Sequence, residues 1–162
     1  MKAAVDSSVL IVLGQLDYLR FVRMLFDRLV IAESVFEEVK ESEVFEQVNA
    51  LIADGFAMVA RSTKSDLLSV LTLNLGRGEA ETIALALEMG VDVAVLDDLK
   101  ARKLARRLKV KIVGTLGVIK ALADMELVKE TPESLCERLV AQGFWVDREL
   151  CLRILRKRVS GV

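Results

Sequence analysis

Acidic side chains are the groups best placed to do chemistry in this sequence, because its 162 residues include no histidine. The absence excludes Ser-His-Asp and Cys-His catalysis, histidine acid–base pairs and histidine-containing zinc sites. Two apolar runs end in acids: residues 3–5 precede Asp6, and residues 91–96 precede Asp97 and Asp98. Both predict buried parallel strands that deliver carboxylates to the carboxyl edge of a sheet, where ligands bind in open α/β folds.

The acids at these strand ends need partners, because an unpaired buried charge is costly. For Asp6 the alternative to a metal site is a cap on the following helix. A helix cap needs only one acid, whereas Asp97 and Asp98 are two in succession, and the repulsion between their charges favours a nearby cation. One of the two would contact the ion, while the other orients a ligand or caps the next helix.

Two glutamates are candidates because of their helical positions. In the helix expected from Glu79 to about residue 89, the apolar face is set by Ala80, Ile83 and Leu87. At about 100° per residue, Glu79 falls within roughly 60° of that face, whereas Glu81 and Glu88 fall nearly opposite and are predicted to face solvent. The alternative for Glu79 is a surface acid that complements the helix dipole.

Glu38 is the weaker of these two candidates. In the helix expected from Ser34 to about residue 48, it lies on the flank of the apolar face, roughly 100° away, and could reach over the sheet edge. A solvated position is the alternative.

A basic stretch follows the last pair of acids. Seven Lys and Arg residues lie between positions 100 and 111 without an intervening acid. Beside an acidic metal site, such a stripe could hold a phosphodiester backbone, and we predict that contact for Arg102, Lys103 and Arg106. The alternative is a solvated helix face. A local patch is required because the net charge of the chain is only −1.

Composition and pattern predict one α/β domain. The chain is 53% hydrophobic and 29% charged with one proline, which is typical of a folded globule. Strands are expected at about 2–5, 29–31, 56–60, 92–96 and 111–113, alternating with helices, and Gly14 is expected to end the first helix. This alternation predicts a parallel sheet covered on both faces.

The two cysteines and the lack of long apolar segments bear on location. Cys136 and Cys151 lie at helical spacing among leucines and are predicted to be core thiols without a redox or metal role. Asp6 interrupts the first apolar stretch, so no signal peptide is expected, and no uncharged run approaches the roughly 18 residues of a membrane span. A cytoplasmic, reducing location is the expectation.

Five segments, in order, resemble the PIN-domain nucleases, a family that includes VapC-type ribonuclease toxins. They are Val5-Asp6-Ser7-Ser8, residues 31–39, Gly76-Arg77-Gly78-Glu79-Ala80-Glu81, Leu96-Asp97-Asp98 and residues 113–117. The likeness is closest to an uncharacterised prokaryotic branch. It implies a three-layer α/β/α sandwich with a mainly parallel sheet of about five strands over residues 1–128, and a helical extension over 129–162 packed on the same domain.

The resemblance also implies a shared site that binds Mg²⁺ or Mn²⁺. It assigns catalysis to Asp6, Glu38, Glu79 and Asp98, metal ligation to Asp6, Glu79, Asp97 and Asp98, and support of the first acid to Ser8. Two departures are Glu79, where aspartate is more common, and Ala32, where proline is common. The implied activity is metal-dependent RNA cleavage, with a possible toxin role, an antitoxin partner and a homodimer.

Two alternatives remain open. One is a non-catalytic PIN-like protein that binds RNA or has a regulatory role. The other is a different phosphoryl-transfer enzyme, although Gly76-Arg77-Gly78 is too short for a nucleotide P-loop and lacks its Gly-Lys-Ser/Thr ending.

Overall fold

A five-stranded, all-parallel sheet forms the centre of the computed structural model, which describes residues 1–157. The strands are β1 (Lys2–Val5), β2 (Arg28–Ala32), β3 (Ala57–Ala60), β4 (Val93–Val95) and β5 (Ile112–Val113). Each strand lies where an apolar run predicted one, and β1, β2 and β4 are almost wholly buried. Continuous burial explains why these runs show no polar alternation.

The strand order is β3-β2-β1-β4-β5. The chain therefore moves outward from β1 through β2 to β3, then returns to the other side of β1 for β4 and β5. The direction in which successive strands are added to the sheet reverses between the parallel neighbours β1 and β4, where Val5 pairs with Val95. Ligands of open α/β folds bind in the crevice at such a reversal, and Asp6 and Asp97 follow these two strands.

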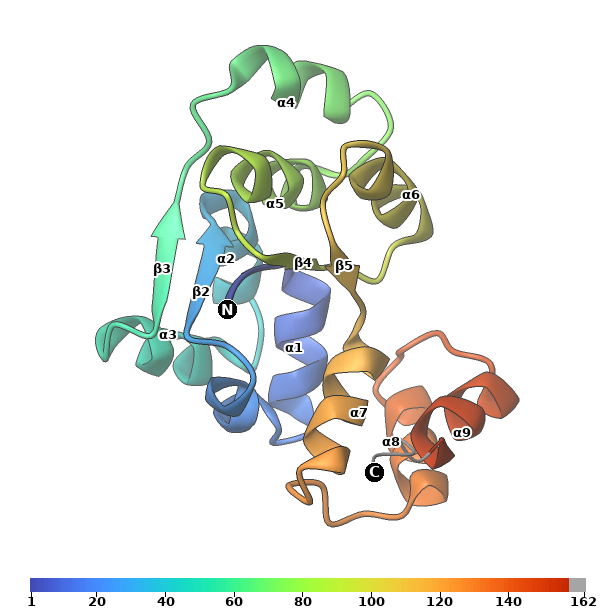
Figure 1. The fold of residues 1–162 in the computed structure, drawn as a ribbon. Coiled ribbons are helices and arrows are strands. Elements are labelled where there is room, and N and C mark those ends of the chain that lie inside the picture. The colour runs from blue at the N-terminus through green and yellow to red at the C-terminus, as the bar shows by residue number, and fades with distance from the viewer. Residues whose placement is uncertain (158–162) are drawn as a thin grey trace.

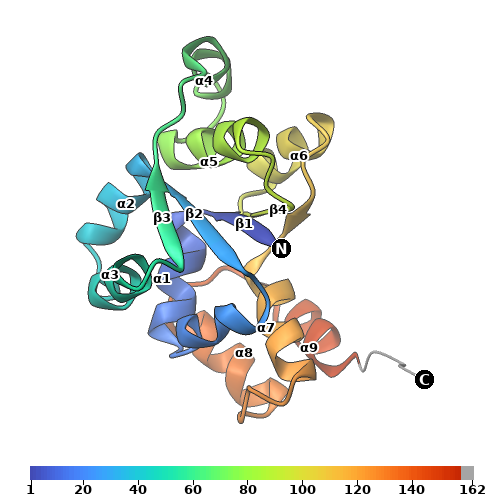
Figure 2. The ribbon, with the colours of Figure 1, turned by 60° about the vertical axis from the view of Figure 1, so that its left-hand side comes forward.

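Helices cover both faces of the sheet, so the predicted three-layer α/β/α architecture is confirmed (Figure 1). The helices α4 (Ser65–Leu71), α5 (Arg77–Glu88) and α6 (Leu99–Arg107) lie on one side. The helix α1 (Ser7–Gln15), the 3-10 helix η1 (Leu19–Met24) and α7 (Thr115–Asp124) lie on the other. Figure 2 shows α2 (Glu33–Lys40) and α3 (Phe45–Ala53) near β3, with α2 contacting both α1 and α5.

The C-terminal segment is helical and packs on the same domain. The helices α8 (Pro132–Ala141) and α9 (Arg148–Arg156) pack together, and α9 also contacts α7. The Tyr18 hydroxyl donates a hydrogen bond to Glu130, which is also paired with Arg138 at 2.6 Å. A domain division at residue 128 stays a prediction, and the last residues of the predicted extension, 158–162, lie outside the described residues.

The prediction of free core thiols is wrong. Cys136 and Cys151 are both buried, as expected, but they form a disulfide between α8 and α9. The helical hairpin brings their Cα atoms to 6.1 Å, within the usual range for a disulfide. Helical spacing predicts that each side chain faces inward, but it cannot show that the two meet.

Two helix boundaries also differ from the prediction. The helix α1 continues past Gly14 to Gln15. A Cβ atom on Gly14 would lie 2.5 Å from Cγ1 of Val44, so this glycine permits close packing and does not end the helix. The helix predicted from Ser34 to residue 48 breaks after Lys40, and a second helix begins at Phe45.

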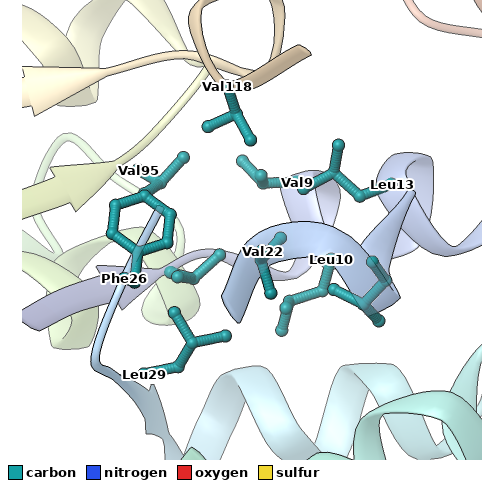
Figure 3. A pocket seen from close by; sticks show the side chains of 10 residues that line it. Val9, Leu10, Leu13, Val22, Phe26, Leu29, Val95 and Val118 are labelled. Atoms are coloured by element: carbon teal, nitrogen blue, oxygen red, sulfur yellow. The ribbon is translucent and has the colours of Figure 1, made fainter. Parts of the chain in front are cut away.

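A small apolar cavity lies in the core, and Figure 3 shows the side chains that line it. Its volume is about 10 Å³, which is no larger than a water molecule. Its walls are aliphatic and aromatic side chains, among them Val9, Phe26 and Val118, and no carboxylate lines it. Within residues 1–157, no helix has both the length and the apolar character to cross a membrane.

Candidate metal and nucleic-acid site

Asp6 lies at the carboxyl end of β1, where the chain enters α1. Its backbone N–H donates to the Val95 carbonyl at 3.2 Å, which ties this point to the end of β4. The residue is only 5% exposed. Its Oδ2 atom accepts a hydrogen bond from the Ser8 hydroxyl at 3.1 Å, whereas its buried Oδ1 atom has no hydrogen-bond partner among residues 1–157.

Burial is the main reason why the pKa of the Asp6 carboxyl is raised from 3.8 to about 6, and the negative charges of Glu79 and Glu38 contribute to the same rise. Hydrogen bonding by the Ser7 backbone N–H and by the Ser8 hydroxyl acts in the opposite sense. A positive charge beside the unpartnered oxygen would offset both the burial and the repulsion.

Glu38 reaches the same place from α2. Its Oε2 atom accepts a hydrogen bond from the Ser7 hydroxyl, which fixes the carboxylate against the start of α1. A Cβ atom placed on Gly78 would lie 3.0 Å from Glu38 Oε1 and 3.4 Å from Asp6 Oδ1. The two carboxylate oxygens therefore converge on the space that glycine leaves open at the start of α5. Ser7 was not predicted as a site residue; its position beside Ser8, directly after Asp6, is the signal that could have found it.

Glu79 lies at the start of α5, where it is engaged with the helix and also acts on Asp6. Its Oε2 atom accepts a hydrogen bond from the Gly76 backbone N–H at 2.8 Å and so caps α5. Its charge also acts on Asp6, as the pKa of that group shows. The half-buried Glu79 therefore lies beside Asp6 while serving as a helix cap.

Asp97 and Asp98 are both engaged at helix N-termini. Asp97 accepts hydrogen bonds from the backbone N–H and the hydroxyl of Thr115, at 2.8 and 2.5 Å, at the start of α7. Asp98 caps α6 by accepting from the Ala101 N–H at 2.8 Å. Within residues 1–157, no three acidic or cysteine side chains converge closely enough to hold a metal ion by themselves. The identity of the fourth acid stays a prediction.

The prediction that Glu81 faces solvent is wrong. Glu81 is 3% exposed, whereas Leu87, predicted to face inward, is 40% exposed. The reason is that α5 packs against β1, β2 and β4 and also against α2, α4 and α6. With neighbours on several sides, the helix has no single apolar face from which orientation can be inferred. Glu88 also has protein partners, the Ser62 and Thr63 hydroxyls.

The predicted basic stripe is partly used by the fold. The half-buried Arg102 donates from Nη1 to the Leu96 carbonyl at 3.0 Å, whereas Lys103 and Arg106 are exposed. Nucleic-acid contact by these three residues stays a prediction.

A groove of about 360 Å³ adjoins the acids. It is lined by Glu33, Ser34, Glu37, Glu38, Arg61 and Arg77. The two arginines come from the β3–α4 connection and the first turn of α5. They are 16 positions apart in the sequence, so no local pattern predicted that they line one groove with Glu38.

The arrangement agrees with the comparison to protein families. A family model described as a PIN domain, DUF3368, matches residues 2–160. The chain belongs to the PIN-domain family. This family consists in general of nucleases, which typically use divalent metals. No curated protein matches the sequence significantly. The match spans all five strands of this PIN domain, which agrees with a single sheet as its centre.

Proposed function

We propose that this PIN domain hydrolyses phosphodiester bonds in RNA with Mg²⁺ or Mn²⁺ held by Asp6 and Glu38, with Glu79 beside them. The observation that carries the proposal is the buried Asp6 Oδ1 atom, which has no hydrogen-bond partner in the described part of the chain and faces the space above Gly78. A buried acceptor without a partner is costly, so this atom is suited to a ligand.

The residues fit a hard divalent cation. Mg²⁺ prefers oxygen ligands, keeps several waters and is often held by one or two carboxylates together with substrate phosphates. The convergent oxygens of Asp6 and Glu38 meet that requirement without a full protein cage. When bound, such an ion supplies Lewis-acid assistance to phosphodiester hydrolysis.

The remaining side chains would orient the carboxylates and the substrate. Ser8 holds one oxygen of Asp6 and Ser7 holds one oxygen of Glu38, so each carboxylate keeps its other oxygen for the ion. Arg61 and Arg77 line the groove beside Glu38 and would bind phosphates that flank the cleaved bond. We propose RNA as the substrate instead of DNA because the sequence resembles the ribonuclease toxins.

To test the proposal, cleavage by the wild type is compared with cleavage by Asp6→Asn. The substrates are structured RNA, unstructured RNA and DNA of the same sequence. Each substrate is incubated with Mn²⁺, with Mg²⁺ and with chelator. Cleavage of RNA that requires both the metal and Asp6 is the expected result. Metal-independent cleavage, or equal cleavage by Asp6→Asn, would contradict it.

RNA binding without cleavage is the second candidate. It is favoured by one observation: Asp97 and Asp98 both serve as helix caps, so the strand that was expected to supply a fourth metal ligand has a structural use for its acids. RNA binding by wild type that neither needs a metal nor leads to cleavage would establish this candidate.

A toxin role, an antitoxin partner, a homodimer and a cytoplasmic location are further proposals, supported by the resemblance to VapC-type toxins. Growth arrest on induced expression, relieved by Asp6→Asn, would support the toxin role. Light scattering of the purified protein would give the oligomeric state.

A further inference from the structure

Glu81 is a buried carboxylate that the proposed reaction does not use. It lies on α5, two residues after Glu79, with 3% of its surface exposed. Its hydrogen-bond donors come from two other segments. The Ser34 N–H, at 3.1 Å, and the Ser34 hydroxyl both bind Oε2, while the Ser62 N–H lies 3.4 Å from Oε1.

Glu81 supplies the acceptor that the start of α2 lacks. The residue at the N-cap position is Ala32, which has no side-chain acceptor. The free N–H groups of a first turn need acceptors, and the positive end of the helix favours a negative charge. Glu81 provides both from a neighbouring helix, and its burial is compensated by these bonds.

The same helix faces carry the acids of the proposed site. Ser34 and Glu38 are four residues apart on α2, while Gly78 and Glu81 are three apart on α5, so each pair shares one face of its helix. Ser34 contacts Glu81, and one turn further along α2 the Glu38 carboxylate lies over Gly78. The helices α2 and α5 therefore meet at two places one helical turn apart: the Ser34–Glu81 contact, which is structural, and the Glu38–Gly78 contact, which belongs to the proposed site.

We propose that Glu81 is a positioning residue: its bonds to the first turn of α2 fix the Glu38 carboxylate opposite Asp6 and so set the affinity of the pair for a divalent ion. The inference rests on the proposed function. It assigns Glu81 no contact with the ion or with RNA.

Mn²⁺ binding measured by calorimetry tests this role in wild type, Glu81→Ala and Glu81→Gln. Glu88→Ala is the matched control, because Glu88 ties the same helix to Ser62 and Thr63 of the β3–α4 connection and, within residues 1–157, makes no hydrogen bond to α2. All proteins are measured at a temperature at which circular dichroism shows them folded. We expect Glu81→Ala to weaken Mn²⁺ binding by about tenfold or more, as is typical for residues that support metal ligands.

Glu81→Gln should lose less Mn²⁺ affinity than Glu81→Ala, because glutamine keeps an acceptor for Ser34. If Glu81→Ala does not fold, the Mn²⁺ affinity of Glu81→Gln tests the inference instead. Glu88→Ala should bind Mn²⁺ as wild type does. Ser34→Ala should weaken binding in the same direction, and combining it with Glu81→Ala should add little.

Two results would overturn the inference while leaving the proposed function intact. One is wild-type affinity in both Glu81 variants, and the other is an equal loss in Glu88→Ala, which would show a general effect of loosening α5. Absence of Mn²⁺ binding by the wild type would instead refute the proposed function, and this inference would fall with it.

Discussion

Replacing Asp6 by asparagine should stabilise the metal-free protein at neutral pH while abolishing the proposed activity. The pKa of this carboxyl is raised from 3.8 to about 6, mainly by burial and in part by the charges of the neighbouring glutamates. At about 1.4 kcal/mol for each pKa unit, the ionised carboxylate costs the fold about 3 kcal/mol at pH 7. Asparagine has nearly the same shape, can still accept the Ser8 hydrogen bond, and carries no charge.

The pH dependence gives the prediction its sign. Because the folded pKa is raised, the unfolded chain releases this proton at a lower pH than the folded protein does. The free energy of unfolding of wild type should therefore fall, relative to Asp6→Asn, as pH rises from about 4 to about 6. The two proteins should be nearly equally stable at pH 4, and the variant should be more stable by up to about 3 kcal/mol at pH 7.

Urea unfolding in the presence of chelator, at several pH values between 4 and 7.5, would measure this difference. Far-ultraviolet circular dichroism is the suitable signal, because the single tryptophan, Trp145, is 98% exposed and its fluorescence would report unfolding poorly. Adding Mn²⁺ should narrow the gap, since only wild type is expected to bind the ion.

Glu88→Gln is a control of opposite sign. Hydrogen bonds from Thr63 and Ser62 lower the pKa of the Glu88 carboxyl, so its ionised form is favoured by folding and its neutralisation should reduce stability at pH 7. If Asp6→Asn were no more stable than wild type at pH 7, or if its advantage persisted unchanged at pH 4, the argument from burial would be refuted.

Three further variants, one single and two double, test other parts of the structure. Gly78→Ala should change the free energy of unfolding by no more than about 1 kcal/mol, since alanine favours helices. It should nevertheless weaken Mn²⁺ binding, measured by calorimetry, on the order of tenfold, because the new methyl group fills the space between the Asp6 and Glu38 carboxylate oxygens. An unchanged affinity would place the ion elsewhere. Replacing Cys136 and Cys151 together by alanine should lower the free energy of unfolding by about 3 kcal/mol in urea titrations, because the disulfide spans 15 positions, and a loss of Mn²⁺ affinity would show unexpected coupling to the site. Replacing Arg61 and Arg77 together by alanine should make the negative slope of log RNA affinity against log salt concentration shallower by about 1.4. An unchanged slope would exclude phosphate contacts by these two arginines in the groove beside Glu38.

The sequence determined the local elements and the positions of the strand-end acids. Apolar runs placed all five strands, because strands buried on both faces need continuous apolar segments. Asp6 could be assigned to the edge of the sheet because it directly follows such a run. Helical geometry also placed Glu38 on the flank of α2, from which its carboxylate reaches the start of α1.

Only the tertiary structure decided which of these groups meet. The position of Glu81 could not be inferred from α5 alone, since burial of that helix depends on its packing against the sheet and against α2, α4 and α6. The disulfide between Cys136 and Cys151 depends on how α8 and α9 pack, and the groove shared by Arg61 and Arg77 depends on how the β3–α4 connection lies beside the first turn of α5. Local periodicity fixes the direction of a side chain relative to its own helix or strand, but its neighbours are set by long-range packing, which leaves no local pattern in the sequence.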